Sequence, residues 1–347
     1  MKSTSLIKLQ AELGTEQQCL AFLEKMRWPD GVRCVTCGGD KISKFTTDEG
    51  ERKRKNPKTG AVEIKKVPAR HLYQCLEPTC KQQFSATSGT VYADTHLPLQ
   101  KWLIAIALTC NAKKGISAKQ MQRDLGVTYK TAWYLNHRIR EAMMDSAPAV
   151  FEGVVEADAT FVGGRFDARR RRARRDKQGV FGLVQRSADG KHSKVHAEPI
   201  PIETQRVVSK IIEDRVSKQA TVYTDEAGAY KYLKRGPRQH DIVIHSRDQY
   251  VKGDVHNNSV ENFWSLFKRG LIGSYHQISV KHLTRYLAEF TFRFNNREAE
   301  NLFAAVVINL AIGNVLGYKR LINTPNPIND SYLPPSANPF SSSDEPF

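Results

Sequence analysis

The sequence predicts an α+β protein of several domains, and three features of its pattern support this prediction. Two cysteine pairs occur near the N-terminus, and helical periodicity covers residues 98–146. From residue 153 onward, three strand-like runs are followed by alternating helix and strand patterns. With 347 residues, the chain is long enough for two or three domains with cores of their own.

The composition favours a polyanionic partner. The 53 Lys and Arg residues outnumber the 36 Asp and Glu residues, which leaves a formal net charge of +17. Nucleic acid is the usual partner of such a surface. There is no apolar run of 18 residues and no signal-peptide pattern, so we expect no membrane partner and a cytoplasmic protein.

Four of the six cysteines have the spacing of zinc ligands. Cys34 and Cys37 form one pair, and Cys75 and Cys80 form the other. Thiolates two to four residues apart can bind from one turn, and two such turns complete a tetrahedral zinc site. We therefore expect one structural Zn²⁺ in a zinc ribbon. The charged insert from Glu49 to Lys66 is expected to form an extended hairpin or a mobile finger.

The helical stretch that follows has the pattern of a helix-turn-helix. Helices are expected over Leu97–Cys110, Ser117–Leu125 and Tyr129–Met144, with a Gly-containing turn before the third. A plain helical hairpin that acts as a spacer is the alternative. If the motif binds DNA, the contacting residues on or near the third helix are Lys130, Thr131, Tyr134 and Arg138.

Two aspartates lie where carboxylates are costly. Asp158 falls inside the strand-like run 154–162, and Asp225 ends the run 220–225. Strands are expected at 153–162, 179–187 and 194–202 as an antiparallel meander. A helix at 204–218, a strand into Asp225, a short helix near Tyr230 and a strand at 242–245 follow. This order is ribonuclease H-like and predicts a domain built on a mixed sheet. A strand-end turn residue is the alternative reading of each aspartate.

A third acid, Glu261, lies on the helix that begins near Asn257. Val260, Phe263, Trp264 and Phe267 give this helix a buried stripe, and Asn257, Asn258 and Ser259 can each cap it. Lys268 comes seven residues after Glu261 and projects in the same direction. Two strand aspartates and a helical glutamate are hard oxygen ligands that suit Mg²⁺. An ordinary amphipathic helix with a surface acid and base remains the plainer alternative.

Six arginines occupy seven positions between the first two expected strands. Such a density cannot be buried, so we assign it to contacts with DNA phosphates, with a solvated loop as the alternative. These residues are Arg169, Arg170, Arg171, Arg172, Arg174 and Arg175.

The acidic residues and their surroundings resemble a known family. Asp158, Asp225 and Glu261, with 35 residues between the last two and Lys268 seven further on, are similar to the DDE transposase and retroviral integrase superfamily. The blocks 156–164, 223–225 and 256–270 resemble bacterial insertion-sequence transposases with an N-terminal zinc ribbon. Ala159 and Val35 stand where relatives often carry Glu and Pro.

The resemblance implies a Mg²⁺-dependent DNA transposase that is bacterial and nucleoid-associated. The site would bind two Mg²⁺ ions, or Mn²⁺ in their place. Asp158 would bind both ions, Asp225 one of them and Glu261 the other. Lys268, with Arg269 beside it, would contact phosphates of the terminal DNA. Water would cleave at the element end, and the freed 3′-hydroxyl would attack target DNA. Both ends must be handled together, so a homodimer or a larger synaptic complex is implied.

The expected domains follow from these assignments. They are an N-terminal helix (1–30), the zinc ribbon with its basic insert (31–96), the helix-turn-helix region (97–148), the ribonuclease H-like DDE domain (149–275), C-terminal helices (276–323) and a disordered tail (324–347).

Three other functions remain open at this stage. A zinc-ribbon and helix-turn-helix regulator with an inactive catalytic domain would bind DNA without nicking it. A metal nuclease of the same fold would cut without joining. A tyrosine recombinase, faintly suggested by His282, Arg285 and Tyr318, would need no Mg²⁺ and gives the three acids no role.

Overall fold

The computed structural model describes residues 4–55, 60–67, 69–93, 95–144, 150–163, 177–187, 192–244, 255–313 and 316–325. It confirms a mixed α+β chain with a small N-terminal ribbon and a mixed sheet further along. The chain forms two compact units. Among the described residues, one unit contains residues 4–107 with 303–316, and the other contains residues 108–302 with 317–325. None of the described helices is both long and apolar enough to span a bilayer.

The N-terminal unit begins with two helices where the sequence predicted one. They are α1 (Leu6–Glu12) and α2 (Glu16–Arg27). The break arises because Thr15 and Gln18 form a capping box that starts a new helix. Cys19 is fully buried in α2 and packs in the core of this unit.

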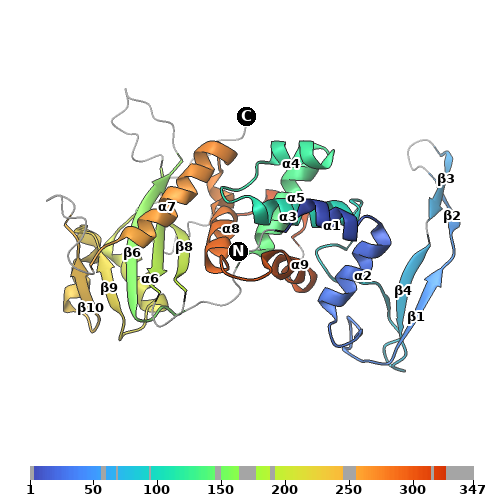
Figure 1. The fold of residues 1–347 in the computed structure, drawn as a ribbon, viewed down its shortest axis with the longest axis horizontal. Coiled ribbons are helices and arrows are strands. Elements are labelled where there is room, and N and C mark those ends of the chain that lie inside the picture. Colours follow the sequence, from blue (N-terminus) through green and yellow to red (C-terminus); the bar gives the residue numbers. More distant parts are fainter. Residues whose placement is uncertain are drawn as a thin grey trace. The chain divides into compact units, whose positions relative to one another are not determined.

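A three-stranded antiparallel sheet forms the ribbon, in the order β1 (Ile42–Thr47), β4 (Arg70–Cys75), β5 (Gln83–Phe84). The basic insert forms its own antiparallel hairpin, β2 (Gly50–Lys55) with β3 (Val62–Val67), which confirms the extended-hairpin prediction (Figure 1). Helices α3 (Leu99–Asn111) and α9 (Leu302–Ile312) contribute to the same unit. The Val91 N–H donates to the Leu310 carbonyl at 3.1 Å.

The other unit opens with two helices joined by a tight turn. Helix α4 (Ala118–Leu125) ends at Gly126, whose φ of 58° is the left-handed conformation that glycine adopts at little cost. Thr128 then caps α5 (Tyr129–Ala142). The three helices predicted between residues 98 and 146 are therefore confirmed.

A five-stranded mixed sheet forms the centre of this unit, in the order β10-β9-β6-β7-β8. Strands β6 (Val154–Val162), β7 (Gln178–Gln185) and β8 (Lys194–Ile200) form the predicted antiparallel meander. Strand β9 (Thr221–Thr224) runs parallel to β6 and to β10 (Gln239–Ile242). The last strand lies earlier than predicted, because its pairing with β9 begins at Gln239.

Helices cover both faces of the sheet. One face packs on α6 (Gln205–Arg215) and on the 3₁₀ helix η1 (Gly228–Arg235). The other face packs on α7 (Asn258–Gly270), which crosses the strands, and on α8 (Leu283–Asn295) (Figure 1). A π-helical segment, η3 (Leu271–Tyr275), continues α7, and a 3₁₀ turn, η4 (Val280–His282), precedes α8. The short α10 (Tyr318–Ile322) lies near the end of the described chain.

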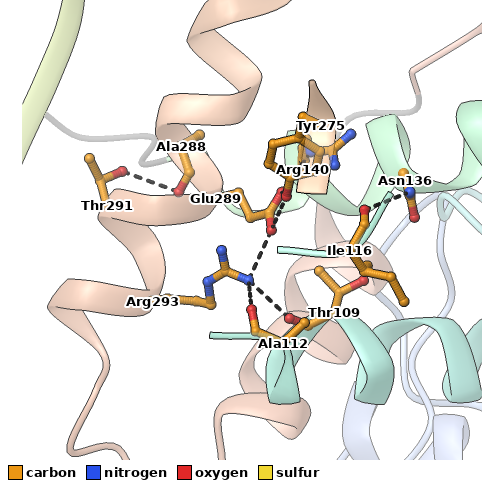
Figure 2. A network of polar contacts seen from close by, with 10 residues as sticks. All are labelled: Thr109, Ala112, Ile116, Asn136, Arg140, Tyr275, Ala288, Glu289, Thr291 and Arg293. Atoms are coloured by element: carbon orange, nitrogen blue, oxygen red, sulfur yellow. Dashed lines mark hydrogen bonds and ion pairs between the residues drawn. The ribbon is translucent and has the colours of Figure 1, made fainter. Parts of the chain in front are cut away.

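A buried ionic network connects α5, η3 and α8 (Figure 2). Glu289 is fully buried and forms ion pairs with Arg140 at 2.7 Å and with Arg293 at 2.9 Å. The Tyr275 hydroxyl also donates to Glu289, at 2.8 Å. Arg293 donates in turn to the carbonyls of Thr109 and Ala112. The helical region before the sheet and the helices on the sheet are thus joined by buried ion pairs and hydrogen bonds, in which Arg293 Nη2 is the buried donor that makes no hydrogen bond among the described residues.

Candidate metal and nucleic-acid sites

The four predicted zinc ligands lie together. Their Sγ atoms are all within 4.8 Å of one another, with 3.7 Å between Cys34 and Cys80 and 3.6 Å between Cys37 and Cys75. Four sulfurs around a tetrahedral zinc with 2.3 Å bonds lie about 3.8 Å apart. The cluster therefore fits one structural Zn²⁺.

Cys34 of the first cysteine pair favours the thiolate form that zinc needs, whereas burial raises the pKa of Cys75 in the second pair. The pKa of the Cys34 thiol is lowered to about 6, and the largest cause is the hydrogen bond that it accepts from the backbone N–H of Cys37. Gly38 donates its N–H to the Cys34 carbonyl at 3.0 Å, which closes the turn. Trp28, Tyr73 and Phe84 pack around the cysteines with ring centroids 5.5–6.0 Å apart.

The three predicted acids come from three elements of one unit. Asp158 is on β6, Asp225 follows β9 directly, and Glu261 is in the first turn of α7. Asp158 and Glu261 line one open hollow of about 540 Å³ together with Lys268 and Arg269. Asp225 is not among the residues that line this hollow; its Oδ1 accepts from the Ala227 N–H at 3.0 Å.

Electrostatics connects these carboxylates even though they do not meet at one point. Burial and the neighbouring Asp225 raise the pKa of Asp158 to about 7, and Glu203 and Glu261 add to the rise. In the part of the chain that the structure describes, the cysteines form the one group of three or more ligand-type side chains close enough to share an ion. A bound cation would offset both the burial of the Asp158 carboxylate and its repulsion by the neighbouring acids, so the donor chemistry fits a divalent ion.

Comparisons with known proteins identify the family. Residues 150–295 match the family described as "ISXO2-like transposase domain", and residues 14–83 match "Transposase zinc-ribbon domain". An "Uncharacterized transposase-like protein" of Haemophilus influenzae is 30% identical over 108 residues, which cover 86% of that protein and 31% of this chain. The chain belongs to the ISXO2-like insertion-sequence transposases.

A longer relative supports the same assignment. An "Uncharacterized protein in transposable element ISH50" of Halobacterium salinarum is 27% identical over 295 residues. The match covers 80% of this transposase and 90% of that protein. It therefore extends well beyond either domain match alone.

Two further polar side chains of this transposase lie near the aspartates, and sequence reasoning missed both. Glu203 follows β8. Burial raises the pKa of its carboxyl group, and the charge of Asp225 adds to the rise, as it does for Asp158. Tyr230 of η1 is buried, and burial together with Glu203, Asp158 and Asp225 raises the pKa of its hydroxyl. Glu203 resembles any acid beside a helix start in the sequence, so no local signal separates it from a surface residue.

The start of α7 is capped differently from the prediction. Asn257 occupies the N-cap position but its side chain makes no capping bond to the helix. The buried Glu156 of β6 instead accepts from the N–H groups of Ser259 and Val260. The only sequence signal was its position two residues before Asp158, which puts both side chains on one face of the strand.

The residues predicted to contact DNA are unevenly exposed. Lys130 is exposed, with its Nζ 4.5 Å from the ring centroid of Tyr318 in α10. Thr131 and Tyr134 are half-buried, and the Tyr134 ring packs on Tyr318 at 5.5 Å. Arg138 is only 6% exposed and stacks on Tyr134, so it is not a surface residue in this arrangement. Arg169 to Arg175 lie outside the described residues.

Proposed function

We propose that this transposase binds the ends of its insertion sequence and catalyses Mg²⁺-dependent DNA strand cleavage followed by strand transfer. The observation that carries the proposal is the hollow that Asp158, Glu261 and Lys268 line together, with Asp225 near enough to raise the pKa of Asp158. The strand order β8-β7-β6-β9-β10, with an antiparallel meander followed by two parallel strands, supports a ribonuclease H-like assignment.

Asp158, Asp225 and Glu261 would hold the divalent ions. When bound, two such ions activate the attacking oxygen and stabilise the leaving oxygen of an in-line phosphoryl displacement. Cations also offset the mutual repulsion of the acids, which allows the carboxylates to approach more closely than they do here.

The chain's own cations would bind the DNA strand. Lys268 and Arg269 line the same hollow and would contact its phosphates, while Trp264 and Ile272 form apolar parts of the wall. The pair α4 and α5, joined by the turn at Gly126, would bind the element end as a helix-turn-helix. Two copies of the chain would be needed to hold two ends, so the working assembly would be a homodimer or larger.

The test uses DNA that carries the element's own ends, with Mg²⁺ and purified protein. Wild type should release 3′-hydroxyl ends and join them to target DNA. Asp158→Ala, Asp225→Ala and Glu261→Ala should each bind the same DNA and form neither product. Glu298→Gln is the control, because this half-exposed carboxylate pairs with His192 and Arg297 outside the hollow.

Other outcomes identify other functions. Cleavage without joined products would indicate a nuclease of the same fold. Specific DNA binding that Asp158→Ala leaves intact, with no nicking by wild type, would indicate a DNA-binding regulator. That second candidate is favoured by the separation of the three carboxylates, which are less tightly gathered than the four cysteines.

A further inference from the structure

A buried carboxylate lies beneath the helix that carries Glu261. Glu156 has no solvent exposure and comes two residues before Asp158 on the same face of β6. Its Oε2 accepts from the backbone N–H groups of Ser259 at 2.8 Å and Val260 at 3.0 Å, and its Oε1 accepts from the Ser259 hydroxyl at 2.9 Å. An acid at this place satisfies N–H groups that a helix start leaves open, and its charge is favoured by the helix dipole.

The charge of Glu156 is balanced from a second strand. Arg186 follows β7, and its Nε donates to Glu156 Oε1 at 2.7 Å. Its Nη2 donates to the His256 carbonyl at 2.6 Å and lies 2.7 Å from His256 Nδ1. The guanidinium also stacks on Tyr223 of β9, 4.8 Å from the ring centroid. A buried ion pair is stable only when its remaining polar atoms are satisfied in this way.

Asn257 connects the same helix start to the strand that precedes Asp225. Asn257 is 2% exposed. With its amide oriented to satisfy both neighbours, its oxygen accepts from the Asp225 N–H at 3.1 Å and its nitrogen donates to the His256 carbonyl at 3.2 Å. The chain at the start of α7 is thus bonded to β6 through Ser259 and Val260, to Arg186 after β7 through His256, and to Asp225 after β9 through Asn257. Two of these attachments lie at proposed metal ligands, because Glu156 is two residues before Asp158 and Asn257 bonds to the backbone of Asp225.

We propose that Glu156 and Arg186 are positioning residues, which fix the start of α7 so that the Glu261 carboxylate stays in the hollow that it lines with Asp158, where it would bind a divalent ion. This inference rests on the proposed function. Neither residue lines the hollow, so each acts through the backbone of α7 and β6. Glu261 comes one residue after Val260, whose N–H bonds to Glu156. If this bond is lost and the first turn of α7 becomes less ordered, the Glu261 carboxylate is among the first groups to move.

The test compares Glu156→Gln with wild type by three measurements. Gln keeps the shape but loses the charge and turns an N–H group toward other donors. Amide hydrogen exchange of Ser259 and Val260 should be faster, while amides of α6 keep their wild-type rates. The affinity for Mn²⁺, followed by electron paramagnetic resonance, should fall about 10-fold, the lower end of the range for groups that orient metal ligands. The Mg²⁺ concentration for half-maximal strand transfer should rise by the same factor.

Two further variants keep the outcome decisive. Glu213→Gln makes the same chemical change at a carboxylate paired with Arg238 on the opposite face of the sheet, and it should leave Mn²⁺ affinity unchanged. Ser259→Ala removes one bond to Glu156 and keeps both backbone bonds, so it should weaken Mn²⁺ binding by a smaller factor, which is the measurement to use if Glu156→Gln does not fold.

The results separate the two proposals. A folded Glu156→Gln variant with faster exchange at Ser259 and wild-type Mn²⁺ affinity would overturn the positioning role and leave the transposase function standing. Wild type that neither binds Mn²⁺ at the carboxylates nor cleaves DNA would overturn the proposed function and this inference with it.

Discussion

Arg140 of α5 and Glu289 of α8 form an ion pair at 2.7 Å with side chains 3% and 0% exposed (Figure 2). Burial disfavours the charged form of Glu289, but Arg293 and Arg140 outweigh it and lower the pKa of this carboxyl. The pair joins the helix proposed to bind DNA to the helices that cover the sheet. Arg293 and Tyr275 also bond to Glu289, so removal of this carboxylate leaves several buried polar groups without their partner.

Glu289→Gln should therefore destabilise the protein strongly. The change leaves Arg140 and Arg293 buried without a counter-charge, and loss of one partner of a buried pair costs about 3–5 kcal/mol. Urea unfolding followed by tryptophan fluorescence gives the difference in the free energy of unfolding. Glu298→Gln, at a carboxylate 50% exposed, should change this free energy by less than about 1 kcal/mol. Equal effects of the two variants would contradict the structural role of the network.

A buried histidine should make stability depend on pH. His137 is fully buried, and its ring packs on Trp133 of α5 and on His282 and Tyr286 from the facing elements, with centroids 4.5–5.6 Å apart. Burial, followed by the charges of Arg140, His282 and Arg285, lowers its pKa from the ordinary 6.5. Below pH 6.5 the unfolded chain therefore binds a proton that the folded chain does not.

The free energy of unfolding should fall as pH decreases from 6.5, by up to about 1.4 kcal/mol per pH unit for this histidine. His282, whose pKa burial lowers to about 4, contributes with the same sign. Urea titrations at several pH values measure the slope. The matched variant His137→Phe should have a shallower slope in the same window. If its slope equals that of wild type, His137 is not the group responsible.

The features that the sequence predicted are those with local causes. The cysteine pairs are defined by short spacings, and α7 by the apolar stripe from Val260 to Phe267. Glu156 was missed as the cap of α7 because its partners Ser259 and Val260 are more than 100 residues away in the chain. The burial of Arg138 could not be predicted for a related reason. It depends on which residues pack against α5, whereas helical periodicity only places Arg138 on one side of that helix.

Loss of zinc should unfold the ribbon selectively. Purified protein should contain one zinc per chain, and Cys75→Ser should lower this content because the remaining three thiolates leave the tetrahedral site incomplete. Elemental analysis measures the metal. Circular dichroism during chelation should show loss of the β1–β4–β5 sheet, while the transition of the larger sheet is retained. Cys110→Ser, at a buried cysteine outside the cluster, should keep the full zinc content.

Exposed and buried basic residues of α5 should affect DNA binding differently. Lys130→Ala removes an exposed cation, so the slope of log affinity against log salt should decrease by about 0.9 if this lysine contacts a phosphate. Arg138→Ala should lower the unfolding temperature and keep the slope, because the side chain is buried against Tyr134. Fluorescence anisotropy with element-end DNA at several salt concentrations measures both slopes. A larger change in slope for Arg138→Ala would mean that α5 rearranges on binding.

Gly182 has no side chain, and this should allow α7 to pack closely against the sheet. Gly182 pairs with Asp158 across β6 and β7, and a Cβ at this position would lie 2.5 Å from Cζ2 of Trp264. Gly182→Ala should therefore push Trp264, one turn after Glu261, away from the strands. We expect a loss of about 1–3 kcal/mol in the free energy of unfolding, as for other overpacked cores, together with slower strand transfer.

A second substitution tests whether this contact is the cause. Trp264→Leu in the Gly182→Ala background should recover part of the lost stability, because the smaller side chain leaves room for the new methyl group. A double-mutant cycle measured by urea unfolding gives the coupling between the two positions. Gly228→Ala is the control, since a Cβ there meets no atom within 4 Å. Purely additive effects of the two substitutions would mean that Gly182 matters for a reason other than its contact with Trp264.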